Sequence, residues 1–415
     1  MDSSWRVNDT AVTPQESPAA TWRAFLSRAR WLWLPVTLFV ATRVGIALVA
    51  YLAVPLIAES ASPPPYHLRG TDNVLLDVFG SRWDTGFYVS IVEEGYVYEA
   101  DPFPSVPFFP LLPLLMRAAL PLTGDAVVAG ILVSNLALLL AAILFYHLVL
   151  AGWGTAVADR AVWYLLIFPS AFFGSAIYTE SLFLLTAIGA LYSARRGRWW
   201  LAGLFGMAAA LTRLVGIIVL PMLLAEWLLQ RGGRGLGVGI PTGRERPSWR
   251  ALPSLGLIPL GTLSYMAYLW QRFGDPLGFV TGSAAWERVP QSPLLTIGEL
   301  LTPPAEGWWA ALLAGRLNLN DWIDLLLVLG FLAAGFVLLY RHRWSEGIFV
   351  WLGVFIPFSS GLLMSQRRYM WVLFPVFILL AQWGRRPWVD RLVTAVSLSL
   401  LALFTALFAN GYWVG

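Results

Sequence analysis

The 415-residue chain contains no cysteine and no lysine, and it has only three histidines. The absence of cysteine excludes disulfides, thiolate metal sites and cysteine nucleophiles, although it does not identify a redox compartment. Because no lysine occurs, the formal net charge of +4 comes from arginine alone. Charged residues make up 13% of the chain, against about 25% in typical soluble domains. So little charge excludes an ordinary soluble protein.

Long apolar runs fill most of the chain instead. Hydrophobic residues make up 58% of the sequence, and the mean hydropathy is +0.67. Apolar windows of roughly 20 residues, enough to cross about 30 Å of hydrocarbon as a helix, recur from one end to the other. We therefore predict an all-α, polytopic integral membrane protein. No small-residue cleavage site follows the first apolar run, which favours a retained span over a signal peptide.

The arginines between the apolar runs predict the topology, because basic loops face the cytoplasm. A tail of residues 1–30, with Arg23 and Arg28, is placed inside, and a single membrane domain follows over residues 31–409. The predicted spans are 31–54, 126–150, 161–174, 180–194, a double crossing over 199–230, 251–271, a span ending at Arg341, 347–364, 370–383 and 392–409. This makes about eleven spans. The predicted loops are 55–125 and 272–320 outside and 231–250 in the cytoplasm, with the C-terminal residues 410–415 outside. The basic residues lie mostly in the loops between spans, so they report on topology and do not indicate nucleic-acid binding.

Three arginines fit this topology poorly. Arg367 and Arg368 in "SQRRY" fall on the outer side, and Arg213 lies at the outer tip of the 199–230 hairpin. An arginine at membrane depth costs several kcal/mol and normally faces a partner or a cavity. Three of them near one leaflet indicate an anionic ligand such as a phosphate. The alternative is that each side chain reaches outward to lipid headgroups.

The stretch "SRWDTGFYVSIVEEGY" follows the first predicted span. Its apolar residues Trp83, Phe87 and Ile91 recur at four-residue spacing and predict a short helix at the membrane interface. Asp84 falls in the first turn, three residues after Ser81, so a capping box and a catalytic carboxylate are equally supported. The next stretch, "PFPSVPFFPLLPLL", has too much proline for one helix. It either lines an apolar groove or simply returns the chain to the membrane.

Other carboxylates are expected on the outer side. Glu93 and Glu94 are adjacent and diverge by about 100° on a helix, so they cannot form a paired-carboxylate site together. Glu180, close to Tyr178, is either an acceptor ligand or a cap at the start of the span over 180–194. Between these two roles, capping is slightly favoured.

The remaining outer candidates have simpler interpretations. Asp275 before a proline is most easily a turn residue, and Trp286 could stack on a sugar ring. His67 lies in an outer loop and is interpreted as inert. No spacing of His, Asp and Glu resembles a metal site, and the sequence predicts no cofactor. A divalent ion between Asp84 and a lipid phosphate stays open.

One outer carboxylate, outer arginines and a lipid-facing groove together suit one kind of chemistry. Transfer of a sugar from a lipid phosphate to a hydroxyl needs a base for the acceptor and cations for the departing phosphate. A single displacement inverts the anomeric centre and needs one carboxylate, whereas retention needs a second carboxylate as nucleophile. Asp84 suffices for the inverting reaction.

Six segments, in order, resemble the PIG-V family of mannosyltransferases and its bacterial relatives. They are "RWDTGFYVSIVEEGY", "PFFPLLPLL", "FPSAFFGSAIYTESLF", "AALTRLVGIIVLP", "FGDPLGFV" and "RRYMWVLFPVF", and the likeness runs from about residue 80 to 384. The resemblance implies the GT-C membrane glycosyltransferase fold and a polyprenyl-phosphate mannose donor. No residue of the chain predicts mannose independently of this resemblance.

The resemblance also implies roles for particular residues. Asp84 matches the catalytic base of the family's W-D pair. Arg213 and Arg368 match expected contacts to the donor phosphate, and Arg367 follows more loosely. Further candidates for substrate binding are Trp83, Tyr88, Glu94, Tyr178, Glu180 and Tyr369.

The acceptor and the setting follow less directly. Eukaryotic members assemble glycosylphosphatidylinositol anchors, whereas a compact, lysine-free chain is more typical of a bacterial plasma membrane. A lipid-linked glycan, a cell-wall polymer or a protein hydroxyl would each serve as acceptor for the same base. Two alternatives are a transporter or flippase for an anionic lipid-linked substrate, and a scaffold without activity. A transporter would be expected to show internal repeats and ionisable groups near the midplane, and the sequence shows neither clearly.

Overall fold

The structure is a computed structural model that describes residues 29–60, 72–98, 103–232, 246–286, 290–361 and 363–414. Every regular element within these residues is a helix. The prediction of an all-α protein is therefore confirmed. His67, the tail over residues 1–28 and most of the predicted loop 231–250 lie outside the described residues.

Within the described residues, six helical segments are long and apolar enough to cross a membrane, so the chain is an integral membrane protein. They are α2 (Arg30–Ala53), α6 (Ala126–Trp153), η2 with α10 (Leu214–Arg231), η3 to α12 (Trp249–Phe273), α16 (Leu319–Tyr340) and α20 (Pro387–Ala409). Shorter apolar helices are α5 (Leu111–Thr123), α9 (Trp199–Thr212) and α17 (Trp344–Phe358). The total of eleven spans stays a prediction.

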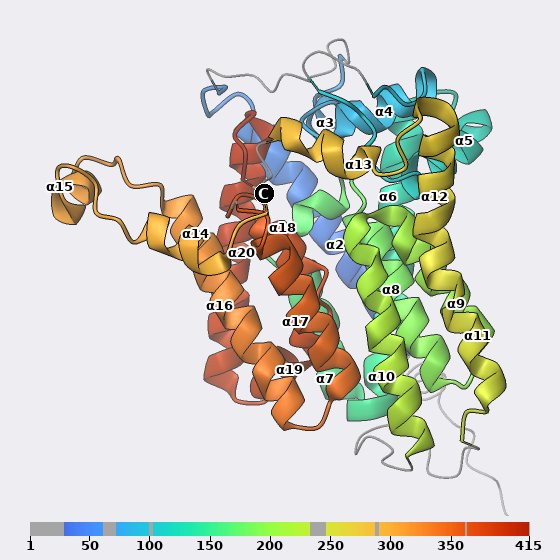
Figure 1. Cartoon of the computed structure of the whole chain (residues 1–415). Helices are drawn as coiled ribbons and strands as arrows, with labels where there is room; N and C mark the ends of the chain where they lie inside the picture. Colours follow the sequence, from blue (N-terminus) through green and yellow to red (C-terminus); the bar gives the residue numbers. More distant parts are fainter. Residues whose placement is uncertain are drawn as a thin grey trace, which may run out of the picture.

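The long helices pack side by side, and short helices lie across one end of the bundle (Figure 1). The helices at that end are α3 (Val74–Gly80), α4 (Thr85–Glu93) and α13 (Gly278–Thr281). From the same half of the molecule α14 (Pro293–Leu300) and α15 (Trp308–Leu313) project sideways. These two helices belong to the predicted outer loop 272–320, which is therefore partly helical.

Three of the predicted spans are not single helices. The span over 251–271 divides at Gly256 into α11 (Leu252–Leu255) and α12 (Leu257–Phe273), and two more divide at prolines. The span over 161–174 divides into α7 (Thr155–Leu166) and η1 (Ala171–Gly174). The span over 370–383 divides into α18 (Gln366–Trp371) and α19 (Pro375–Trp383). Pro169 and Pro375 account for both breaks, because proline removes a backbone donor and restricts the residue before it.

The predicted hairpin over residues 199–230 is confirmed as two helical arms. The α9 helix ends at Thr212, and the η2 and α10 segment begins at Leu214. Arg213 between them has extended backbone, with φ −168° and ψ 155°. The turn therefore falls at the residues where the sequence predicted it.

Arginines gather at the end of the bundle opposite α3 and α4. Arg195, at the end of α8 (Glu180–Arg195), lies 3.2 Å from Glu346. Arg343 donates to the same Glu346 at 2.6 Å, and the buried Glu226 joins the group through Arg195. Buried charges are stable only when paired, so this network fixes α8, α10 and α17 against one another. Because a 16-residue helix is about 24 Å long, Glu180 at the start of α8 lies well away from this network.

Candidate active site

Asp84 immediately precedes α4 at the end of the bundle where the short helices lie. Its side chain makes no capping hydrogen bond, and the hydroxyl of Ser81 has no partner among the described residues. Instead, Oδ2 of Asp84 accepts a hydrogen bond from Nη1 of Arg368 at 2.6 Å. The capping-box alternative is therefore wrong, because the carboxylate turns toward an arginine 284 residues later in the chain.

The backbone before Asp84 is held in a conformation that few residues adopt. Trp83 has φ 58°, in the left-handed region that disfavours a bulky side chain. Such a conformation costs of order 1–3 kcal/mol and needs support from its surroundings. The Trp83 ring packs against the Trp413 ring, with 4.9 Å between centroids. This packing holds Trp83 behind Asp84, outside the cavity that Asp84 lines.

Arg368 enters the same region from α18. The residue before this helix, Ser365, also has positive φ, at 75°. The Arg368 side chain is buried, and its Nε lies 3.2 Å from Oε1 of Glu180. Its guanidinium is 5.2 Å from the ring centroid of Tyr178 and 5.4 Å from that of Trp413. These carboxylates and aromatic ring faces thus compensate for the hydration that the Arg368 guanidinium loses when it is buried.

Glu180 holds two arginines at once. It is the first residue of α8, and Thr179 before it makes no side-chain capping bond. Its side chain is 1% exposed, and Oε1 lies 2.9 Å from Nη2 of Arg213 as well as near Arg368. The preference for a capping role is therefore wrong. Glu180 instead positions the two guanidinium groups.

Arg213 faces inward at the tip of the hairpin. Its side chain is only 14% exposed, and its guanidinium lies 5.2 Å from the ring centroid of Tyr369. The alternative that Arg213 reaches outward to lipid headgroups does not fit a side chain buried in this way. Its Nη1 is buried with no hydrogen-bond partner among the described residues. That N–H group is free to bind an acceptor atom of a ligand.

These residues line one cavity of about 410 Å³. Its charged groups are two carboxylates and two arginines, Asp84, Glu180, Arg213 and Arg368. Its other walls include Tyr88, Pro107, Phe108, Phe109, Tyr178, Trp286, Met364, Tyr369 and Trp413. The charges balance, and apolar and aromatic groups surround them. Such a cavity suits a ligand with a phosphate group and an apolar portion.

Two tyrosines in this cavity remain neutral. Burial, followed by the negative charge of Asp84, raises the pKa of Tyr88 and that of Tyr178 well above the usual phenol value. Glu180 contributes in the same direction. A neutral phenol keeps its proton and can donate a hydrogen bond to a ligand oxygen.

Three predicted site residues lie outside this cavity. Arg367 turns away from Arg368 and pairs with Asp324 of α16, with 2.7 Å between Nε and Oδ1. Glu94 is exposed at the end of α4, and Trp83 packs behind the cavity. The structure thus brings together Asp84, Tyr88, Tyr178, Glu180, Arg213, Arg368 and Tyr369, and it leaves Arg367, Glu94 and Trp83 outside.

Asp275 and Trp286 are two further residues that the sequence placed in the predicted outer loop. Asp275 accepts hydrogen bonds from the Leu277 backbone at 2.8 Å and from Tyr98 at 2.6 Å, which confirms its turn role. Trp286 lines the cavity and packs at 5.7 Å against Phe108. Sequence reasoning missed Met364, which directly precedes "SQRRY", and Trp413, because an apolar or aromatic side chain is no distinctive signal in so apolar a chain.

No metal site accompanies the cavity within the part of the chain that the structure describes. No group of three His, Asp or Glu side chains there is placed to hold an ion. The carboxylates of Asp84 and Glu180 instead pair with Arg213 and Arg368.

Comparison with known proteins finds similarity over part of the chain. Residues 33–230 match the family model described as Mannosyltransferase (PIG-V). The curated relatives include GPI alpha-1,6-mannosyltransferase 2 of Rattus norvegicus and of Mus musculus, each 34% identical over 179 residues. These matches cover 40% of this chain and 36% of each relative. The matched part therefore spans about a third of the relatives' length.

Solved structures show a weaker likeness. ArnT from Cupriavidus metallidurans bound to undecaprenyl phosphate has a TM-score of 0.47 and 15% identity, covering 91% of this chain and 76% of that one. The Archaeoglobus fulgidus oligosaccharyltransferase in complex with Zn and sulfate has a TM-score of 0.41 and 14% identity, covering 90% and 53%. At this level of similarity neither structure assigns a role to a residue of this chain.

Proposed function

We propose that the protein is an inverting membrane glycosyltransferase of the GT-C type, related to the PIG-V mannosyltransferases whose family model residues 33–230 match. It takes a sugar, mannose by family analogy, from a polyprenyl-phosphate donor and moves it to a hydroxyl of a glycolipid or glycan. The reaction takes place at the extracytoplasmic face. The arginine-rich links at the opposite end of the bundle support this orientation, because basic loops face the cytoplasm.

The proposed reaction is a single displacement. Asp84 takes the proton of the acceptor hydroxyl as its oxygen bonds to the anomeric carbon. The bond between that carbon and the phosphate oxygen breaks, and polyprenyl phosphate leaves with the bonding electrons. One carboxylate is sufficient for inversion.

The two arginines hold the leaving group. The free Nη1 of Arg213 offers a charge-assisted hydrogen bond to the phosphate. Arg368 would exchange its contact with Asp84 for one with the phosphate, which frees the Asp84 carboxylate to act as base. Glu180 keeps both guanidinium groups in position during this exchange.

A single observation carries the proposal. Asp84, the expected base, and Arg213 and Arg368, the expected phosphate ligands, come from three distant segments and line one cavity. Arg368 contacts Asp84 at 2.6 Å. Glu180 links the two arginines, because it contacts Arg213 at 2.9 Å and Arg368 at 3.2 Å. Burying four ionisable groups around a cavity is costly, and a charged substrate that enters the cavity would offset part of that cost.

Purified protein incubated with radiolabelled polyprenyl-phosphate mannose and a panel of glycolipid acceptors tests the function. We expect labelled glycolipid product, or slow release of free mannose when acceptor is omitted. Movement of intact donor across vesicles without covalent change would instead support a transporter. Binding of the donor with neither outcome would indicate a scaffold.

A further inference from the structure

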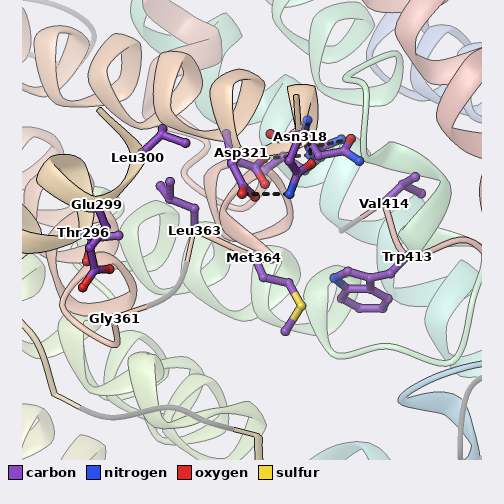
Figure 2. A pocket seen from close by; sticks show the side chains of 13 residues that line it. Thr296, Glu299, Leu300, Asn318, Asp321, Gly361, Leu363, Met364, Trp413 and Val414 are labelled. Atoms are coloured by element: carbon purple, nitrogen blue, oxygen red, sulfur yellow. Dashed lines mark hydrogen bonds and ion pairs between the residues drawn. The ribbon is translucent and has the colours of Figure 1, made fainter. Parts of the chain in front are cut away.

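A second cavity adjoins the one that contains Asp84. It has a volume of about 520 Å³ and is lined by α14, α16, the segment before α18, Arg367 of α18 and residues 413–414. Figure 2 shows Asn318 and Asp321 on one side of this cavity and Thr296 and Glu299 on another. Met364 and Trp413 line both cavities and therefore form the wall that they share.

Arg367 supplies the buried centre of this second cavity. Its side chain is 1% exposed and is fixed by Asp324 and by the backbone oxygen of Asn320, which it contacts at 3.1 Å. One nitrogen, Nη1, is left buried without a partner among the described residues. A buried donor that stays unpaired carries a desolvation cost, which a ligand oxygen would remove.

Two more donors are unpaired in the same cavity wall. The Thr296 hydroxyl, on a residue that is 5% exposed, has no partner among the described residues, and neither has the indole N–H of Trp413. Both residues line the cavity. Three unsatisfied donors on one cavity exceed what a well-packed protein interior normally leaves.

Hydrogen-bond acceptors face these donors. The carboxylates are Glu299, Asp321 and Asp324, and Arg367 is the one cation among the described residues that line the cavity. This excess of negative charge disfavours a phosphate or a carboxylate ligand. No three side chains of the described residues converge as metal ligands, which argues against an ion as occupant. A neutral ligand that both donates and accepts hydrogen bonds remains.

We propose that this cavity binds the hydroxyl-rich head group of the acceptor, a neutral sugar or other polyol. A hydroxyl donates one hydrogen bond and accepts two, so a ring carrying several of them satisfies the donors and the carboxylates together. The face of Trp413 offers an apolar surface to the ring. Because Met364 and Trp413 are shared with the Asp84 cavity, a polyol held here places one hydroxyl at the boundary between the two cavities. The proposal rests on the proposed function, since it assigns the acceptor of that reaction.

A photoreactive probe tests the site without relying on turnover. The full chain, reconstituted in phosphatidylcholine nanodiscs, is irradiated with an octyl α-mannoside that carries a diazirine, and the labelled peptides are identified by mass spectrometry. We expect labelling at Met364 or within 291–301 or 413–414. Excess octyl α-mannoside should block it, and octyl phosphate, with the same tail and an anionic head, should not.

Two variants make the test specific. Asp321→Asn should reduce labelling about tenfold and Thr296→Val about fivefold, because each loses one hydrogen bond to the probe. Glu306→Gln is the matched control, since Glu306 pairs with the exposed Arg316 and does not line the cavity. Its labelling should equal that of the wild type. Thermal unfolding midpoints of all three should stay close to the wild-type value.

The outcomes separate this inference from the proposed function. Labelling elsewhere, labelling unaffected by both variants, or equal competition by octyl phosphate would each overturn the polyol site. Labelled glycolipid formed by an enzyme whose cavity is never labelled would remove only this assignment. Labelling in the cavity of a protein that never releases mannose from the donor would remove the acceptor role together with the proposed function.

Discussion

Two adjoining cavities differ in their charge and in the arginine that each contains. The Asp84 cavity has two carboxylates and two arginines within aromatic walls. The second cavity has three carboxylates and one arginine among amide and hydroxyl groups. Arg368 and Arg367 are consecutive on α18, and consecutive helical residues diverge by about 100°. One short helix therefore supplies an arginine to each of two cavities with different electrostatics, the proposed lipid-phosphate site and the proposed polyol site.

The largest expected effect is in the Asp84 cavity. Asp84→Asn removes the proposed base but keeps the shape of the side chain, so turnover should fall by about 10² to 10⁴ fold while donor still binds. Steady-state transfer from labelled polyprenyl-phosphate mannose measures the change. Asp275→Asn, which alters a turn carboxylate at the same end of the molecule, should retain wild-type turnover. Near-normal turnover in Asp84→Asn would show that Asp84 is not the base, and the Asp84 cavity would then have no catalytic residue to distinguish it from the second cavity.

In the second cavity, the expected effect of a substitution is on the free energy of unfolding of the protein. Arg367→Ala leaves Asp324 buried without its partner, which typically costs about 3–5 kcal/mol. Thermal unfolding should show a much lower midpoint, and the double variant Arg367→Met with Asp324→Leu should recover most of it. Arg316→Ala breaks an exposed pair and should cost at most about 1 kcal/mol. Equal midpoints for Arg367→Ala and the wild type would mean that Arg367 is not needed to neutralise Asp324.

A smaller effect is expected for donor affinity. Arg213→Ala removes a charge-assisted contact worth about 1.5–3 kcal/mol, so the dissociation constant of the donor should rise about 10- to 100-fold. Equilibrium binding of labelled donor to nanodiscs measures it. Arg272→Ala is the control, because Arg272 is an exposed arginine near the same end and outside both cavities. Unchanged affinity in Arg213→Ala would remove this side chain from the phosphate site.

A substitution in the wall that the two cavities share should have the smallest effect, and that effect should appear in both cavities. Trp413→Ala loses ring contacts worth about 0.5–1.5 kcal/mol, so turnover and photoprobe labelling should each fall about two- to tenfold. Trp309, which is 78% exposed on α15, provides the control Trp309→Ala. A loss in only one of the two measurements would show that the wall serves a single cavity.

Several of these features could be predicted from the sequence because they depend on local composition. Apolar runs predicted helices, and the turn at Arg213 followed from the need to return a basic loop to the cytoplasm. Asp84, Arg213 and Arg368 were singled out because a charged residue in an apolar setting needs a partner. The sequence could not predict which partner each would have. Glu180, for which the sequence slightly favoured a cap over an acceptor ligand, holds two arginines from other segments.

Arg367 is the clearest case of the difference. Sequence alone placed it beside Arg368 as a second phosphate ligand, because the two are adjacent and basic. The structure separates them: Arg368 meets Asp84, 284 residues away, and Arg367 meets Asp324, 43 residues away. The breaks at Pro169 and Pro375 were likewise overlooked, since apolar composition continues across them.

The sequence by itself determined that this chain lies in a membrane, that it is helical, and which few ionisable residues needed an explanation. Hydrophobicity and the cost of burying charge act residue by residue, so they can be inferred without knowing the neighbours. Only the tertiary structure decided which of those residues share a cavity. A cavity forms where distant helices meet, and Trp413 next to Trp83 and Arg368 is brought there by packing over hundreds of residues.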